Sequence, residues 1–112
     1  MPVFVPDTGD LVWLTFDPQV GHEQAGRRPA LILSPRSYNR KSGLALGCPL
    51  TNQVKQCPFE VPLPPGCGAS GAILADQLKS LYWSARRAAK IGRVSQPTLD
   101  EVFARLDPLL RY

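Results

Sequence analysis

The densest cluster of reactive side chains in this chain of 112 residues lies between Gly21 and Pro29. It contains an imidazole, a carboxylate and two guanidinium groups, from His22, Glu23, Arg27 and Arg28. Cleavage of a phosphodiester by a neighbouring 2′-hydroxyl needs such a set, because one group takes the hydroxyl proton and cations stabilise the phosphorane. Arginine suits the phosphate because its planar guanidinium donates two parallel hydrogen bonds. A solvated surface loop carries the same residue types, so this cluster alone leaves both interpretations open.

A second group of polar residues follows a predicted strand at residues 44–48. Thr51 offers a hydroxyl, and the next two residues, Asn52 and Gln53, offer amides. These groups could hold a phosphate or read the edge of a base. A turn in which Thr51 and Asn52 satisfy nearby backbone groups has the same composition, and taken alone the turn is the favoured interpretation.

A third group of polar residues lies further along the chain. Strand alternation places Gln77 and Lys79 on one face. Arg86 follows two aromatic residues, Tyr82 and Trp83. Aromatic side chains near basic residues can stack on bases, although a core position is the favoured interpretation, for Trp83 especially.

The net charge of +4 is unevenly distributed along the chain. Residues 1–26 carry four acidic side chains and no Lys or Arg, whereas residues 27–93 carry eleven basic and two acidic side chains, a net charge of +9. A basic segment with aromatic residues nearby is typical of a surface that meets phosphates. Lys and Arg also protect exposed sheet edges, so charge alone does not separate a nucleic-acid-binding surface from a solvated rim of hairpins.

Composition excludes several other classes of protein. No apolar run approaches the ~20 residues of a membrane helix, and the N-terminus lacks the features of a secretion signal, so we expect a cytoplasmic protein that does not enter a membrane. The three cysteines form no CxxC pair, so the sequence predicts neither a zinc knuckle nor a thioredoxin-type redox pair. His22 is the only histidine, which removes mechanisms that need two. Neither a metal nor a cofactor is expected.

Short strands separated by turn residues dominate the pattern. Residues 9–16 are apolar and aromatic and stop at an Asp-Pro pair. Residues 19–28 contain two glycines and little apolar content, which indicates a loop, and residues 36–43 indicate a turn or one turn of helix. The remaining predicted strands are 30–33, 44–48, 59–63, 72–75, 78–83 and 88–94, with Pro62 favouring an edge position.

The C-terminal segment changes to helical periodicity. Apolar side chains recur on one helical face at Leu99, Val102, Phe103, Leu106, Leu109 and Leu110. Thr98 begins a capping box, Ser95 offers a competing start, and Pro108 is expected to kink the helix or end it near Asp107. One domain over residues 1–112, a small and strongly bent barrel of short antiparallel strands with a C-terminal α-helix, fits this pattern.

The order and spacing of the motifs resemble the MazF/PemK toxins. The resemblance covers nearly the whole chain and rests on Pro6-Asp7-x-Gly9-Asp10, Phe16-Asp17-Pro18, Gly21-x-Glu23-Gln24-x-Gly26-x-Arg28-Pro29-Ala30, Leu33-Ser34-Pro35, Tyr38-Asn39, Pro49-x-Thr51, Pro58-Phe59-Glu60-Val61, Asp76-Gln77-x-Lys79-Ser80 and Ala85-Arg86. It implies a mainly β protein with the SH3-like barrel of the CcdB/Kid type. Such toxins of type II toxin–antitoxin pairs form homodimers and cut single-stranded RNA at short sequences without a metal. An acidic antitoxin neutralises them by covering the RNA site.

The resemblance also implies roles for individual residues. Arg28 and Thr51 match the family's catalytic arginine and threonine, and Glu23 matches a carboxylate proposed as the general base in close relatives. Substrate contacts are expected at Gln24, Asn39, Lys55, Gln77, Lys79 and Arg86. The general base stays open between Glu23, whose pKa nearby arginines would lower, and His22, which titrates near neutrality without such help.

These observations together predict a metal-independent, sequence-selective endoribonuclease under the control of an antitoxin. Attack by the 2′-hydroxyl on messenger RNA would leave 2′,3′-cyclic phosphate and 5′-hydroxyl ends. A non-enzymatic toxin that traps a topoisomerase uses the same barrel in related groups, so the fold does not decide between the two functions. The acid–base residues between Glu23 and Arg28, together with Thr51, favour the nuclease over that alternative and over an inactive RNA-binding domain.

Overall fold

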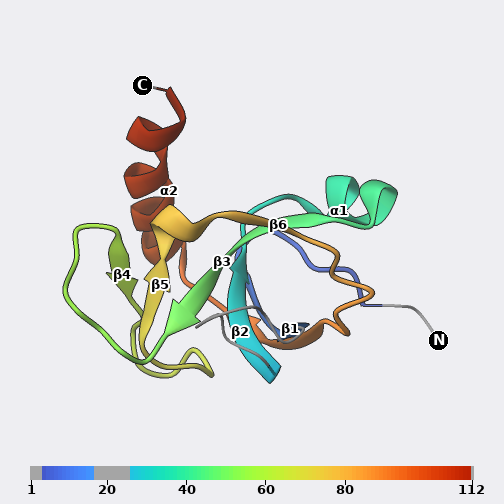
Figure 1. Cartoon of the computed structure of the whole chain (residues 1–112), viewed down its shortest axis with the longest axis horizontal. Helices are drawn as coiled ribbons and strands as arrows, with labels where there is room; N and C mark the ends of the chain where they lie inside the picture. Colours follow the sequence, from blue (N-terminus) through green and yellow to red (C-terminus); the bar gives the residue numbers. More distant parts are fainter. Residues whose placement is uncertain (1–3, 17–25, 112) are drawn as a thin grey trace.

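The computed structural model describes residues 4–16 and 26–111, which form one curved antiparallel sheet with a long C-terminal helix against it (Figure 1). The strands are β1 Asp10–Phe16, β2 Gly26–Ile32, β3 Ala45–Thr51, β4 Glu60–Pro62, β5 Ala72–Leu74, β6 Lys79–Leu81 and β7 Ala89–Arg93. The helices are α1 Arg36–Ser42, the short 3-10 helix η1 Ala75–Gln77, and α2 Gln96–Arg111. The predicted mainly β fold with a C-terminal helix is confirmed.

The sheet is open, because its described strands do not close into a complete ring. Its order is β4-β5-β3-β2-β1-β7, with β6 paired to β3 outside that path. β3 serves two partners: its first half pairs with β6 through Ala45 and Leu81, and its second half pairs with β5 through Leu50 and Ile73. β4 ends the path, so Pro62 lies on an edge strand as predicted.

Apolar side chains pack on both faces of the curved sheet because residues alternate between the faces along each strand. On one face, Leu11 and Leu31 belong to a cluster that includes Leu99, Val102 and Leu106 of α2. The cluster on the other face consists of Val12, Leu14, Ala30, Ile32, Ala45, Leu81 and Trp83. Trp83 therefore has the core position that the sequence favoured.

The helices differ from expectation at their ends. The Ser95 hydroxyl accepts a hydrogen bond from the Thr98 N–H at 3.4 Å, so Ser95 caps α2 and the capping box that begins at Thr98 is wrong. Pro108 lies inside α2, which continues to Arg111, because a proline in the last turn removes only one intrahelical donor. α1 has seven residues, more than the single turn expected. In the part of the chain that the structure describes, no helix has the length and apolar character needed to cross a membrane.

Two strand boundaries matter for function. β2 begins at Gly26, and Arg27 and Arg28 pair with Thr15 and Leu14 of β1, so these arginines are strand residues and not part of a loop. Thr51 is the last residue of β3 and does not follow the strand. The backbone hydrogen bonds of the sheet therefore fix Arg27, Arg28 and Thr51, which were expected in a loop and just after a strand.

Candidate active site

A groove opens where β2 and β3 stop pairing. Their ladder ends at Ala30 and Pro49, and beyond this pair the two strands diverge (Figure 1). The opening has a volume of about 350 Å³, and Arg28 from β2 and Thr51 from β3 both border it. The other lining residues are Trp13, Arg27, Pro29, Leu50, Asn52, Gly68, Ala69 and Ser70. The structure thus brings together the two residues predicted to act on the phosphate.

The position of Thr51 depends on a close backbone approach. Gly71 has φ +100°, and a Cβ there would lie 2.1 Å from the Thr51 carbonyl oxygen and 2.9 Å from Oδ1 of Asn52. Only glycine fits between the two segments. The Ser70 hydroxyl donates a hydrogen bond to the same Asn52 oxygen at 3.1 Å. The turn before β5 therefore holds the end of β3 in place.

The Thr51 side chain makes the local turn interaction that its sequence context favoured, and it also borders the groove. Its hydroxyl accepts a hydrogen bond from the Gln53 N–H at 3.0 Å, which is the local turn interaction. That bond uses an oxygen lone pair and not the hydroxyl hydrogen. Thr51 is also half-buried at the groove, where a hydroxyl can donate to a bound anion.

Arg27 and Arg28 are consecutive in β2 but differ in their surroundings. The guanidinium of Arg27 donates to the Thr15 hydroxyl at 2.8 Å and to the Arg87 carbonyl at 2.6 Å, which ties β2 to the turn before β7. Arg86, a predicted substrate contact, donates to the Thr15 carbonyl at 3.2 Å. Arg86 therefore lies at the same end of the β1–β2 pair as Arg27.

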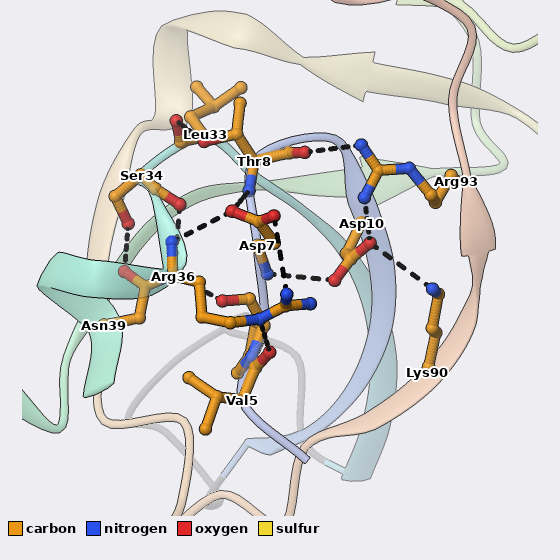
Figure 2. A network of polar contacts seen from close by, with 11 residues as sticks. Val5, Asp7, Thr8, Asp10, Leu33, Ser34, Arg36, Asn39, Lys90 and Arg93 are labelled. Atoms are coloured by element: carbon orange, nitrogen blue, oxygen red, sulfur yellow. Dashed lines mark hydrogen bonds and ion pairs between the residues drawn. The ribbon is translucent and has the colours of Figure 1, made fainter.

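Asn39 does not lie where a substrate could reach it. Its side chain has no exposed surface, and its amide nitrogen donates to the carbonyls of Pro6 and Ser34 at 2.8 and 3.0 Å. Its amide oxygen accepts from the Ser34 hydroxyl at 2.5 Å, a contact visible in Figure 2. The expected substrate contact at Asn39 is therefore corrected to a structural role, joining the N-terminal segment to α1.

Three other predicted contacts lie outside the groove lining. Lys55 is exposed in the loop between β3 and β4, and its backbone N–H donates to both Glu60 carboxylate oxygens at 2.9 and 3.2 Å. Gln77 is exposed at the end of η1, and Lys79 is half-buried in β6 opposite Gly47. A substrate longer than one nucleotide would be needed to span these positions and Thr51.

The predicted general bases, His22 and Glu23, and the expected contact Gln24 lie outside the described residues. Their roles stay predictions. β2 begins three residues after Glu23, at Gly26, so the chain returns from that segment directly into the strand that carries Arg28.

The groove also contains a residue that the sequence analysis missed. Trp13 is 40% exposed although its neighbours Val12 and Leu14 are fully buried. Strand alternation gave no signal for this, because it groups Trp13 with the buried Leu11. The exposure of Trp13 could be predicted only by knowing which residues pair with it on the neighbouring strands.

The side chains that line the groove favour an anion as the ligand. It contains two guanidinium groups, two hydroxyls, one amide and one indole, and among the described lining residues there is no carboxylate. Guanidinium groups and hydroxyl donors are the groups that hold a phosphate and stabilise charge on a phosphorane. A phosphodiester with an attached base is the ligand that matches this set.

Comparisons with known proteins agree with one another. Residues 7–110 match the family described as PemK-like, MazF-like toxin of type II toxin-antitoxin system. The chain is 50% identical over 107 residues to the endoribonuclease toxin MazF of Escherichia coli, and the match covers 96% of each chain. A crystal structure of MazF from Deinococcus radiodurans superposes with a TM-score of 0.90 at 51% identity, covering 98% of this chain and all of the other. A MazE-MazF crystal structure from the same organism gives a TM-score of 0.90 at 52% identity, covering 96% and 97%.

Proposed function

The chain belongs to the PemK-like, MazF-like toxins of type II toxin–antitoxin systems, and we propose that it is a metal-independent endoribonuclease that cleaves single-stranded messenger RNA. The observation that carries this proposal is the position of Arg28 and Thr51 on the two walls of one cationic groove. A protein-binding module has no need of a phosphate-binding pair at such a place. Cleavage takes place in the cytoplasm, where the messenger RNA is.

The proposed reaction needs three functions from the protein. Arg28 donates two parallel hydrogen bonds to the scissile phosphate and stabilises the phosphorane, and the Thr51 hydroxyl donates a further one. Glu23 or His22 takes the proton of the 2′-hydroxyl, whose oxygen attacks the phosphorus. The bond from phosphorus to the 5′-oxygen breaks and that oxygen takes up a proton. The products are a 2′,3′-cyclic phosphate and a 5′-hydroxyl.

The test is single-turnover cleavage of a short single-stranded RNA in EDTA. Arg28→Ala should slow cleavage by roughly 10²–10³, the usual effect of removing one donor that stabilises the charged intermediate. Arg28→Lys should restore little, because an ammonium cannot make two parallel bonds to the phosphate. Thr51→Val, which keeps the shape and removes the hydroxyl, should also slow the reaction.

The matched control is Arg40→Ala, which removes an exposed arginine of α1 that does not line the groove. It should cleave at the wild-type rate. Arg27→Ala is a poor control, because it also breaks two hydrogen bonds, one to Thr15 of β1 and one to Arg87 in the turn before β7. Full activity in Arg28→Ala would remove this groove from the mechanism. A wild-type protein that leaves RNA intact but traps a topoisomerase on DNA would establish the alternative toxin function.

We also propose an acidic antitoxin as the partner, since one solved relative is a MazE-MazF complex. Residues 27–93 carry a net charge of +9, which should attract an acidic segment that competes with RNA for the same cations. Inhibition by the antitoxin should therefore weaken as the salt concentration rises. An antitoxin that binds the chain and leaves its affinity for RNA unchanged would contradict this proposal.

The proposed assembly is a homodimer with two-fold symmetry. The open sheet has unpaired strand edges at β4 and β7 among its described strands, and apolar side chains such as Tyr82 and Leu110 are exposed. Burying such surface favours self-association. Sedimentation at micromolar concentration should give twice the mass of one chain, and a monomer alone would contradict the proposal.

A further inference from the structure

We propose that Trp13 is a specificity-determining residue that stacks on one nucleobase of the bound RNA, in the groove that Arg28 and Thr51 border. This inference rests on the proposed ribonuclease function and names the part of the substrate that the indole recognises. Its basis is the position of an exposed aromatic ring inside a groove whose other functional groups bind anions.

The two tryptophans of the chain have different environments. Trp83 is 7% exposed, and its indole N–H donates to the Asn39 carbonyl at 3.0 Å, so it is a core residue. Trp13 is 40% exposed in the middle of β1, the strand that lies between β2 and β7. The exposed indole of Trp13 borders the groove, where a flat ligand can cover it.

The neighbours of Trp13 leave its ring accessible. Its paired residues on the adjacent strands are Pro29 and Ala89, both without long side chains. Gly68 and Ala69 form part of the groove lining together with it, and they are also small. A volume of about 350 Å³ is at the lower end of small-molecule pockets and suits one flat group and not a large ligand.

Charge favours a nucleobase over an apolar peptide side chain as the occupant. Arg27 and Trp13 lie on the same face of the sheet, because Arg27 pairs with Thr15, two residues along β1 from Trp13. The guanidinium of Arg27 has five N–H donors, and its bonds to Thr15 and Arg87 use two of them. A base on the indole would therefore bring its phosphate close to fixed positive charge.

Stacking explains how a small protein could bind an unpaired base in a stretch of RNA. Bases in single strands are free to leave their neighbours and lie against an aromatic ring. The asparagine and serine at the same groove, Asn52 and Ser70, offer hydrogen-bonding groups at the rim of such a base. The aromatic ring supplies affinity, and these polar groups could add a preference among bases.

The test measures the affinity for a short RNA that contains the site cut by the wild-type protein, with a 2′-deoxyribose at the cut so that it binds without reaction. Trp13→Ala should weaken binding about 10- to 100-fold, the range for loss of one base–aromatic stack. Trp13→Phe should recover most of that affinity. The slope of affinity against salt should stay at its wild-type value in both variants, because stacking involves no ion release.

A matched control and a paired substitution in the RNA make the test specific. Phe103→Ala removes an aromatic side chain of similar exposure, 42%, from the outer face of α2 and should leave RNA binding unchanged. Replacing one nucleotide at a time by an abasic ribose should weaken wild-type binding at the stacked position and have no further effect at that position in Trp13→Ala.

The outcomes separate this inference from the proposed function. A wild-type protein that neither binds nor cuts RNA contradicts the ribonuclease itself. RNA cleavage by the wild type, with unchanged affinity in Trp13→Ala or with abasic effects that are additive at every position, overturns the role of Trp13 alone. Loss of antitoxin binding with normal RNA affinity in Trp13→Ala would also overturn it and assign the groove to the protein partner.

Discussion

The guanidinium of Arg93 lies 2.7 Å from the carboxylate of Asp10, which has no exposed surface (Figure 2). The Lys90 ammonium is 3.7 Å from the same oxygen, and the second oxygen accepts a hydrogen bond from the Asp7 N–H at 2.9 Å. A buried charge is stable only when such partners replace the water it has lost. Asp10 therefore joins β7 and the N-terminal segment to the start of β1.

Removing the closer cation should destabilise the fold. Arg93→Met leaves the buried Asp10 with the more distant Lys90, and we expect the free energy of unfolding to fall by about 2 kcal/mol, less than the full effect of an uncompensated buried charge. Lys90→Met is the control and should cost well under about 1 kcal/mol, as exposed ion pairs do. Urea denaturation measures both. An equal loss of unfolding free energy in the two variants would mean that the distance of each cation from Asp10 does not determine how much it stabilises the fold.

Acid should weaken the attachment of the N-terminal segment to α1. The Arg36 backbone N–H donates to Asp7 at 2.9 Å and, with the Thr8 N–H and the Arg36 guanidinium, holds the pKa of this carboxyl below its ordinary value. Because the folded state has the lower pKa, Asp7 stabilises the protein above the unfolded-state pKa and loses that contribution as the pH falls through the folded-state pKa. Asp7→Asn should be less stable than wild type at pH 7, and the difference should shrink in strong acid.

A second variant identifies the cause of that pKa shift. Arg36→Met removes the guanidinium but keeps the backbone N–H, which is the larger influence on Asp7. It should therefore retain most of the dependence of stability on pH. Unfolding curves between neutral pH and strong acid measure this, and a complete loss of the acid slope in Arg36→Met would assign the effect to the ion pair.

Gly71 should tolerate no side chain. Gly71→Ala would place a Cβ 2.1 Å from the Thr51 carbonyl oxygen, so the end of β3 must move. We expect this variant to lose stability and to cleave RNA more slowly. Gly66→Ala is the matched control: its φ of +88° is similarly strained but no atom lies within 4 Å, so it should cost only about 1–2 kcal/mol and keep its activity. Equal effects of the two variants on cleavage would show that the close approach of Gly71 to Thr51 is not needed for cleavage.

The three cysteines should react with alkylating agents in a fixed order. Burial, and to a lesser extent the nearby charge of Asp76, raises the pKa of the Cys48 thiol to about 12, so almost no thiolate is present at pH 8. Cys57 is exposed and should be modified first by iodoacetamide. Mass spectrometry should find Cys48 modified only after unfolding in urea. Modification of Cys48 at the rate of Cys57 in the native protein would contradict its burial.

The sequence pattern predicts most strands well where a short apolar run is bounded by turn residues. β1, β3, β5 and β7 lie close to their expected positions for this reason. β2 was predicted too short, since Arg27 and Arg28 carry no apolar signal although they pair with β1. Pairing between strands is a property of distant residues, which no local pattern contains.

The site was predictable only in part for the same reason. The family resemblance selects Arg28 and Thr51, and the structure brings both to one groove, while their catalytic roles stay predictions. The polar type of Asn39 could not reveal that its amide faces inward, because one of its partners is the carbonyl of Pro6, far away in the sequence. Trp13 was missed because only its neighbours on two other strands distinguish an open ring from a buried one.

The point at which β2 and β3 separate has an evolutionary consequence. Arg28 and Thr51 lie within two residues of the buried Ala30 and Leu50. A substitution that moved either residue would therefore also disturb the packing of the core and be selected against. Most of the loop between β3 and β4 is exposed and has no such constraint. Lineages built on this scaffold can therefore vary that loop while Arg28 and Thr51 keep their positions at the groove.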